Sequence, residues 1–393
     1  MWAAKGGCVV HDFKIRHLVG LRLCAIVALI SIPLAAVSYA SSSVDVQVSG
    51  TKDRIIIEYT SSDHVIHSVK IADEEFQEIN LPGEATSMER GAPSLPLVCR
   101  SIIVPDERKM SVRVVDSDYY EISARVAPSK GSIQRSINPD NVPYDFGPAY
   151  EQDSFYPEST VTLSEPYILR NYRGVVVKLH PFQYNPVKGT LRIYTRLSVE
   201  IFDTGPGEVN LRQIRMNPIS LNRAFHLLYK HHFMNYDMYC RYEPLVESGG
   251  LLIIAHDQWV PYLQPLIAHK NSIGMTTELV PVSTIGDTAE SIKALIQDRF
   301  SLGDLSFVLL VGDAEHVASP EYVMYEEVGL SDPTYSLLAG NDTYPDIMVG
   351  RFSAQTVEHV MTQVERTVEY EQLPATGQEW FWRGTGLGSD QGP

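Results

Sequence analysis

Three aspartates in one stretch of the chain have the side chains best suited to a binding site. Asp313 follows the apolar run 307–311, whereas Asp342 and Asp346 precede a second apolar run at 347–349. Calcium takes six to eight hard oxygen ligands from carboxylates and backbone carbonyls, so three carboxylates in one region favour a calcium site. Aspartates also cap turns without binding an ion, and this structural role stays open as an alternative.

The elements that carry these aspartates are predicted to form a parallel sheet. The apolar runs are short and do not alternate with polar residues, which is typical of strands buried on both faces. From residue 251 onward, strand-like runs alternate with apolar residues at helical spacing, and this order predicts an α/β region. We expect strands at 251–255, 276–282 and 307–312, and helices that begin near Asp257, at Asp287–Glu290 and at Ser353.

Ligand sites of open parallel sheets form at the carboxyl ends of the strands. Asp313 follows the strand predicted at 307–312, and Asp390 follows a last strand predicted from about Trp382 to Gly388. Their positions therefore make Asp313 and Asp390 stronger candidates for a ligand or catalytic site than the other carboxylates. His256 and His316 also follow strands, but a lone histidine there is more often structural than catalytic, and we assign neither a role in catalysis.

Residues 41–204 have a different pattern. Short runs rich in valine, isoleucine and tyrosine alternate with polar residues and are separated by glycine and proline, which predicts antiparallel strands in a β-sandwich-like domain. Residues 205–249 form a connector, and its stretch 223–241 is predicted to be partly helical. Residues 250–393 then hold the α/β part.

The N-terminus has the form of a secretory signal peptide. Lys14, Arg16 and Arg22 precede the apolar run 23–37, and small residues stand at Ser38 and Ala40. A membrane anchor is the alternative, although the run is short and contains Pro33. We therefore expect residues 1–40 to be a removed signal, the mature protein to be extracellular, and no later segment to span a membrane.

Composition limits the possible partners. The chain of 393 residues has a formal net charge of −16, from 32 basic and 48 acidic residues, which argues against binding to nucleic acid phosphates. Of its four cysteines, only Cys99 and Cys240 lie outside the signal segment. They could form a disulfide, and a buried free thiol at Cys99 is an equal alternative.

Four longer motifs resemble the gingipain-type cysteine peptidases, family C25. The sequence VLLVGD stands at 308–313, and GNDTYPDIMVGRFS at 340–353 follows the family pattern GNDxYxDIxVGRFS. GAPSLPLVCRSIIVP at 91–105 and the hairpin-like stretch 174–201 resemble the family's propeptide. The resemblance implies a multi-domain protein, with a β-rich propeptide followed by the N-terminal part of a caspase-like catalytic domain.

The resemblance also implies a function. It is that of a secreted zymogen of a cysteine endopeptidase, which hydrolyses protein or peptide substrates after arginine or lysine and is inhibited by its own propeptide. Position by position, a structural calcium would be bound by Asp313, the carbonyl of Ala339, Asp342, the carbonyl of Tyr344, and Asp346.

The remaining implied sites concern catalysis and processing. Asp390 would assist a catalytic histidine that, like the catalytic cysteine, comes later in the family's sequence. No cysteine follows Arg241, so we expect this chain to be a truncated and inactive N-terminal piece. The Arg241–Tyr242 bond resembles the junction that opens the mature enzyme. Two alternatives stay open: an inactive relative used for adhesion or surface assembly, and a processing peptidase of a secretion system.

Overall fold

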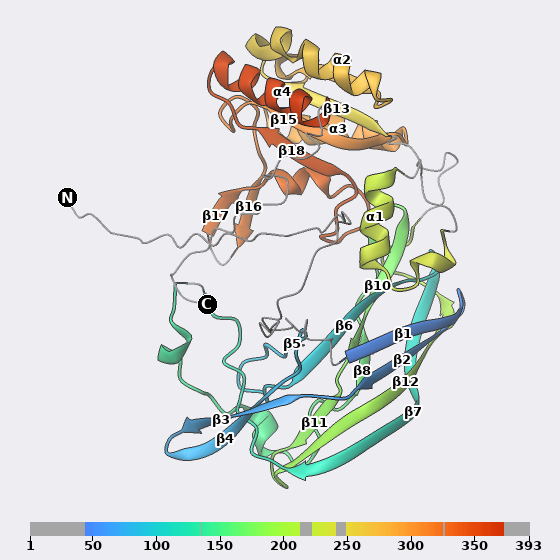
Figure 1. Cartoon of the computed structure of the whole chain (residues 1–393), viewed down its shortest axis with the longest axis vertical. Coiled ribbons are helices and arrows are strands. Elements are labelled where there is room, and N and C mark those ends of the chain that lie inside the picture. Colours follow the sequence, from blue (N-terminus) through green and yellow to red (C-terminus); the bar gives the residue numbers. More distant parts are fainter. Residues whose placement is uncertain (1–43, 135, 213–221, 241–248, 325–326, 373–393) are drawn as a thin grey trace, which may run out of the picture.

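The computed structural model describes residues 44–134, 136–212, 222–240, 249–324 and 327–372. Figure 1 shows a β-rich N-terminal region below an α/β region, with helix α1 between them. The predicted signal peptide therefore lies outside the described residues. Among the residues that the structure describes, no helix is long and apolar enough to cross a membrane.

The N-terminal region is built from two five-stranded sheets packed around one core. In the first sheet β2 alternates buried Ile55, Ile57 and Tyr59 with more exposed residues, which is the pattern of a strand with one face toward a core. The strand order is β1-β2-β12-β11 with β7 also paired to β12 in one sheet, and β5-β6-β10-β8 with β9 also paired to β10 in the other. The strands are β1 (Val44–Thr51), β2 (Arg54–Ser61), β5 (Ala85–Thr86), β6 (Pro96–Ile103), β7 (Arg108–Ser123), β8 (Val161–Leu163), β9 (Tyr167–Leu169), β10 (Tyr172–Leu179), β11 (Phe182–Asn185) and β12 (Thr190–Pro206).

Side chains from both sheets form the core of this region, so the expectation of a β-rich, sandwich-like N-terminal part is confirmed. The hairpin predicted in 174–201 is β11–β12. Its turn is closed by Asn185, whose Oδ1 accepts from the N–H of Lys188, and by Gly189 at φ +60°. Smaller elements are the hairpin β3 (Val65–Ile71) and β4 (Glu74–Asn80) and the 3-10 turns η1 (Pro139–Asn141) and η2 (Pro148–Glu151).

The C-terminal region contains a parallel sheet between two layers of helices. Its order is β14-β13-β15-β18, and all three pairings are parallel. Helix α3 packs on one face of the sheet, and α2 and α4 pack on the other. The elements are β13 (Gly250–Ala255), η4 (Asp257–Leu263), α2 (Gln264–Ser272), β14 (Thr277–Pro281), η5 (Val282–Thr284), α3 (Ala289–Ser301), β15 (Leu305–Val311), β16 (Glu321–Met324), β17 (Glu327–Leu330), η6 (Asp332–Ser336), β18 (Met348–Phe352) and α4 (Val357–Gln372).

The strands predicted at 251–255, 276–282 and 307–312 are confirmed, and the last one, predicted from about Trp382 to Gly388, lies outside the described residues. The helix starts differ from the predictions. The first segment starts as a 3-10 turn, η4, which contains Pro261, a residue without a backbone N–H to donate. Asp257 does not cap it; its carboxylate accepts from Ser283 instead. Helix α3 is capped by Thr288, whose Oγ1 accepts from the N–H of Ser291, so the cap lies one residue after Asp287.

The described part of the connector contains a helix, as its sequence indicated. Helix α1 (Arg223–His232) begins after Asn222, whose Oδ1 accepts from the N–H of Phe225 at 2.8 Å. Its buried aromatic side chains join those of the 3-10 turn η3 (Tyr236–Met238) and of β9 in a separate core cluster. Cys99 and Cys240 are both free, and Cys99 is exposed, so the expectation of a buried thiol at Cys99 is wrong.

Candidate functional site

The carboxyl end of β15 carries Asp313, as the sequence predicts. Its Oδ1 accepts from the N–H of Ala314 at 2.9 Å, and its Oδ2 accepts from Nε2 of Gln355 at 3.0 Å. The hydrogen bond from Gln355 is the main reason why the pKa of Asp313 lies below its usual value. Its backbone N–H donates to the carbonyl of Ala354, so Asp313 lies beside the residues that follow β18.

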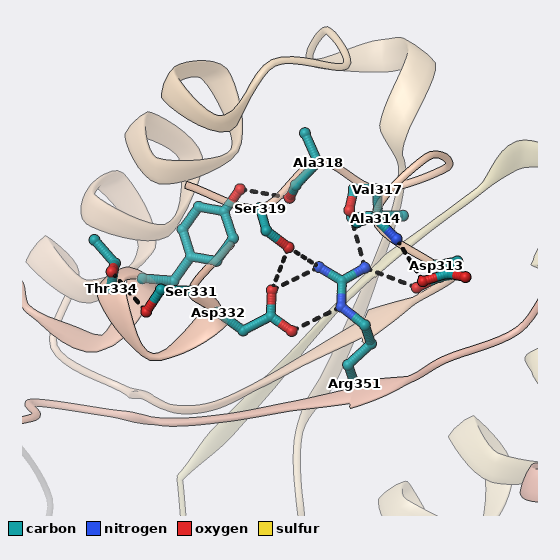
Figure 2. A network of polar contacts seen from close by, with 11 residues as sticks. Asp313, Ala314, Val317, Ala318, Ser319, Ser331, Asp332, Thr334 and Arg351 are labelled. Atoms are coloured by element: carbon teal, nitrogen blue, oxygen red, sulfur yellow. Dashed lines mark hydrogen bonds and ion pairs between the residues drawn. The ribbon is translucent and has the colours of Figure 1, made fainter. Parts of the chain in front are cut away.

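A largely buried arginine holds the loop that follows β15 (Figure 2). Nη1 of Arg351, on β18, donates to the carbonyls of Gly312 at 2.7 Å and Val317 at 2.9 Å. Its Nε and Nη2 form a two-pronged pair with Asp332, at 2.7 Å each, and Nη2 also donates to Oγ of Ser319 at 2.8 Å. Loop 312–319 is therefore attached to both β18 and η6 through one guanidinium group.

Two histidines also meet at this end of the sheet. The rings of His256, after β13, and His316, after β15, have centroids 4.9 Å apart, and both rings contact Trp259. The sequence did not indicate that these histidines would be neighbours. They pack as an aromatic group against a buried tryptophan, and we assign them no catalytic role.

Asp342 and Asp346 lie together in the loop before β18. Oδ1 of Asp342 accepts from the N–H of Tyr344 at 3.0 Å. Oδ2 of Asp346 accepts from the N–H groups of Leu338 at 2.8 Å and Ala339 at 2.7 Å. Asp346 is fully buried, and this burial raises its pKa to about 6 despite the hydrogen bonds that it accepts.

The loop needs glycine at position 340. Gly340 has φ +77°, a left-handed conformation, and a Cβ atom there would lie 2.7 Å from Oδ2 of Asp342. The glycine thus lets the chain pass close to the Asp342 carboxylate. This is the physical basis of the Gly-Asn-Asp sequence that the motif analysis singled out.

The sequence predicted one calcium site with five ligands. The structure corrects this prediction, because Asp313 lies at one end of the sheet and the loop 339–346 lies at the other. Phe307 pairs with Met348 and Val311 with Phe352, so Asp346 lies at the amino end of the strands and Asp313 at their carboxyl end. At about 3.3 Å per residue, the strand separates the two carboxylates by roughly 25 Å. The sequence pattern does not reveal this, because the loop before β18 returns the chain to the opposite end of the sheet.

The surroundings of the two aspartates of the loop do not fit a calcium ion. Their oxygens accept from backbone N–H groups, including those of Leu338, Ala339 and Tyr344, and the Arg170 guanidinium lies 2.7 Å from the Asp346 carbonyl oxygen. A divalent cation beside Asp346 would meet this fixed positive charge. Among the described residues, no group of three or more histidine, cysteine, aspartate or glutamate side chains is arranged to hold a metal.

Comparison with known proteins places these motifs in a family. A model of the C25 propeptide matches residues 40–223, and a model of peptidase family C25 matches residues 246–392. Gingipain R2 of Porphyromonas gingivalis is 36% identical over 311 residues, 77% of this chain and 41% of that protein. This chain belongs to peptidase family C25. It spans about two fifths of the length of that relative.

Other C25 proteins are also similar. A Lys-gingipain of Porphyromonas gingivalis is 25% identical over 311 residues, 75% of this chain and 18% of that protein. A solved complex of RgpB pro- and mature domains from the same organism is 36% identical, with a TM-score of 0.45, and the match covers 49% of this chain and 97% of that one.

The remaining C25 site predictions fall outside the described residues. Asp390 follows the last described residue, and Arg241 and Tyr242 lie between described segments. The residues that sequence reasoning missed are Arg351 with Asp332, and Arg170. The available signal was a charged side chain inside or beside an otherwise apolar run, in MVGRF and YILRN.

Proposed function

We propose that this chain is the N-terminal part of a secreted cysteine endopeptidase zymogen. It comprises a signal peptide (1–40), an inhibitory propeptide and the first part of a caspase-like catalytic domain. The observation that supports this proposal is the order of the two C25 matches, propeptide first and peptidase second, on one chain. The parallel sheet with helices on both faces is compatible with that catalytic fold.

Arginine is the favoured residue before the cleaved bond. Gingipain R2 is 36% identical to this chain, against 25% for Lys-gingipain. A solved gingipain R is described as an Arg-specific cysteine proteinase. These identities favour the arginine type, and a pocket that accepts arginine needs a carboxylate to pair with the guanidinium.

The proposal predicts activity that depends on a thiol outside this sequence. We expect purified 44–393 to hydrolyse no arginine or lysine peptide, because no cysteine follows Cys240. We expect a longer product of the same gene to hydrolyse arginine peptides and to lose this activity when its thiols are blocked.

Two observations would contradict the proposal. One is thiol-sensitive hydrolysis by 44–393 itself. The other is a gene that, read beyond Pro393, lacks the histidine and the cysteine expected after further strands. The second result would instead favour an inactive relative with a role in adhesion or surface assembly.

A second prediction concerns processing at Arg241. The connector contains several arginines, and Arg241 lies shortly before β13 in a sequence that resembles the family's processing junction. N-terminal sequencing of the secreted protein is expected to begin at Tyr242, and Arg241→Ala is expected to abolish that start. A mature start elsewhere would rule out the site. The Tyr242 start in a variant lacking the downstream cysteine would keep the site but exclude self-processing.

A further inference from the structure

A cavity of about 300 Å³ lies at one end of the N-terminal β-sandwich. Its walls come from the β1–β2, β6–β7 and β9–β10 turns, together with Arg212 after β12 and Tyr239 after η3. Ligand pockets measure about 300–1,000 Å³, so this cavity has the size of a site for a small molecule. None of its lining residues belongs to the predicted catalytic, processing or calcium sites.

Two neighbouring residues bring opposite charges to the cavity. Lys52 and Asp53 form the two-residue turn between β1 and β2. Both are exposed, and among the described residues no hydrogen bond or ion pair engages the ammonium of Lys52 or the carboxylate of Asp53. The other two charged residues of the lining neutralise each other, since Nη1 of Arg212 lies 2.9 Å from Oδ2 of Asp106. The described lining therefore offers one unpaired charge of each sign.

A tyrosine adds a hydroxyl group to this charged side of the cavity. The hydroxyl of Tyr239 is buried and has no hydrogen-bond partner among the described residues, although buried polar groups nearly always have one. Burial, followed by the nearby Asp106 and Asp53 carboxylates, raises the pKa of Tyr239 to about 12, so the hydroxyl keeps its proton at neutral pH and can donate it. Nζ of Lys52 lies 4.5 Å from the centroid of the same ring. A donor and a positive charge are thus available to one anionic group.

The rest of the wall is largely apolar. Ile103, Val104 and Pro105 follow one another at the end of β6, and the first two are buried. The ring of Tyr172 stands edge-on to that of Tyr239, with centroids 5.9 Å apart and planes at 74°. A few polar groups converging beside an apolar wall are typical of small-molecule sites. This wall suits an apolar side chain.

We propose that this cavity binds the zwitterion of a free α-amino acid with an apolar side chain. Lys52 and the Tyr239 hydroxyl bind the carboxylate, Asp53 binds the ammonium, and the apolar wall receives the side chain. The Cα atoms of Lys52 and Asp53 are about 3.8 Å apart, and the two charged groups of an α-amino acid are likewise joined to one carbon. A simple anion would leave Asp53 without a partner, and a simple cation would leave Lys52 without one.

Calorimetric titration of purified 44–393 with L-leucine and L-phenylalanine tests the site. At least one of the two is expected to bind saturably, with one molecule per chain. Two further probes each lack one charge: N-acetyl-L-leucine has no ammonium, and L-leucinamide has no carboxylate. Both are expected to bind at least tenfold more weakly than L-leucine. Absence of binding by both amino acids, or equal affinity for L-leucine and L-leucinamide, would overturn the proposal.

Variants assign each charge to its partner. Lys52→Gln is expected to weaken L-leucine binding at least tenfold and to leave the affinity for L-leucinamide unchanged, because that probe has no carboxylate to lose. Asp53→Asn is expected to weaken L-leucine equally and to spare N-acetyl-L-leucine. Lys70→Gln, at an exposed position of β3 outside the lining, is the matched control and is expected to change nothing. Unchanged L-leucine affinity in both cavity variants would place the binding elsewhere and refute the site.

Tyr239→Phe separates binding from folding. The change removes the unpartnered hydroxyl but keeps the ring beside Lys52, so the melting temperature of the ligand-free protein is not expected to fall. The affinity for L-leucine is nevertheless expected to drop severalfold. A lower melting temperature with unchanged affinity would contradict the role of this hydroxyl in binding. None of these measurements involves hydrolysis, so an inactive full-length protein would refute the proposed peptidase function and leave the amino-acid site intact.

Discussion

Asp390→Asn in the full-length enzyme is expected to lower kcat by roughly a hundredfold to ten-thousandfold. The resemblance assigns Asp390 to the acidic group that orients the catalytic imidazole, and an amide at such a position favours the wrong tautomer while preserving the shape. KM and the melting temperature are expected to stay close to the wild type. The measurement is the pH profile of kcat on an arginine peptide.

Asp390→Glu is the matched control, because it keeps the carboxylate. It is expected to restore most of the turnover that asparagine removes. Near wild-type kcat in Asp390→Asn would show that Asp390 is a solvated loop residue. Equal loss in both variants, together with a lower melting temperature, would assign it a structural role only.

Arg351→Met is expected to lower the free energy of unfolding by about 3 kcal/mol, in the range found when one partner of a buried ion pair is removed. Only 12% of the Arg351 side chain and 24% of the Asp332 side chain are exposed. The change leaves Asp332 without its partner and deprives Gly312 and Val317 of a donor. Urea unfolding of 44–393 followed by tryptophan fluorescence measures it.

The control for this effect is Arg299→Met. Arg299 pairs with Glu278 at the surface, so its loss is expected to cost less than about 1 kcal/mol. A loss no larger in Arg351→Met than in this control would show that loop 312–319 does not depend on Arg351.

The same pair predicts a pH dependence. Burial raises the pKa of Asp332, whereas hydrogen bonds from Arg351 and Ser319 lower it. The lowering effects are together the larger, so the pKa lies below its usual value. A carboxylate with a lowered folded-state pKa stabilises the protein above its unfolded-state pKa, and this stabilisation disappears as the pH falls below about 4. Arg351→Met is expected to flatten that part of the stability curve. An unchanged slope would contradict the assignment.

Much of the α/β region could be predicted from the sequence because its signals are local. The buried strands β13 and β15 are short apolar runs, and α3 has apolar side chains on one face. The exact helix starts could not be predicted as well, because Asp287 and Thr288 are both good caps and only packing selects between them.

The sequence by itself determined the C25 family, the order of a β-rich part before an α/β part, and the strands that carry the aspartates. The tertiary structure alone decided which of these residues meet. Asp313 and Asp346 lie in one motif-rich stretch, yet a buried strand holds them at opposite ends of the sheet. Asp346 instead meets Arg170, which is distant in sequence. The spacing of apolar side chains predicts local helices and strands. Contacts between residues distant in sequence, such as Asp346 and Arg170, depend instead on how the whole chain packs around its buried charges.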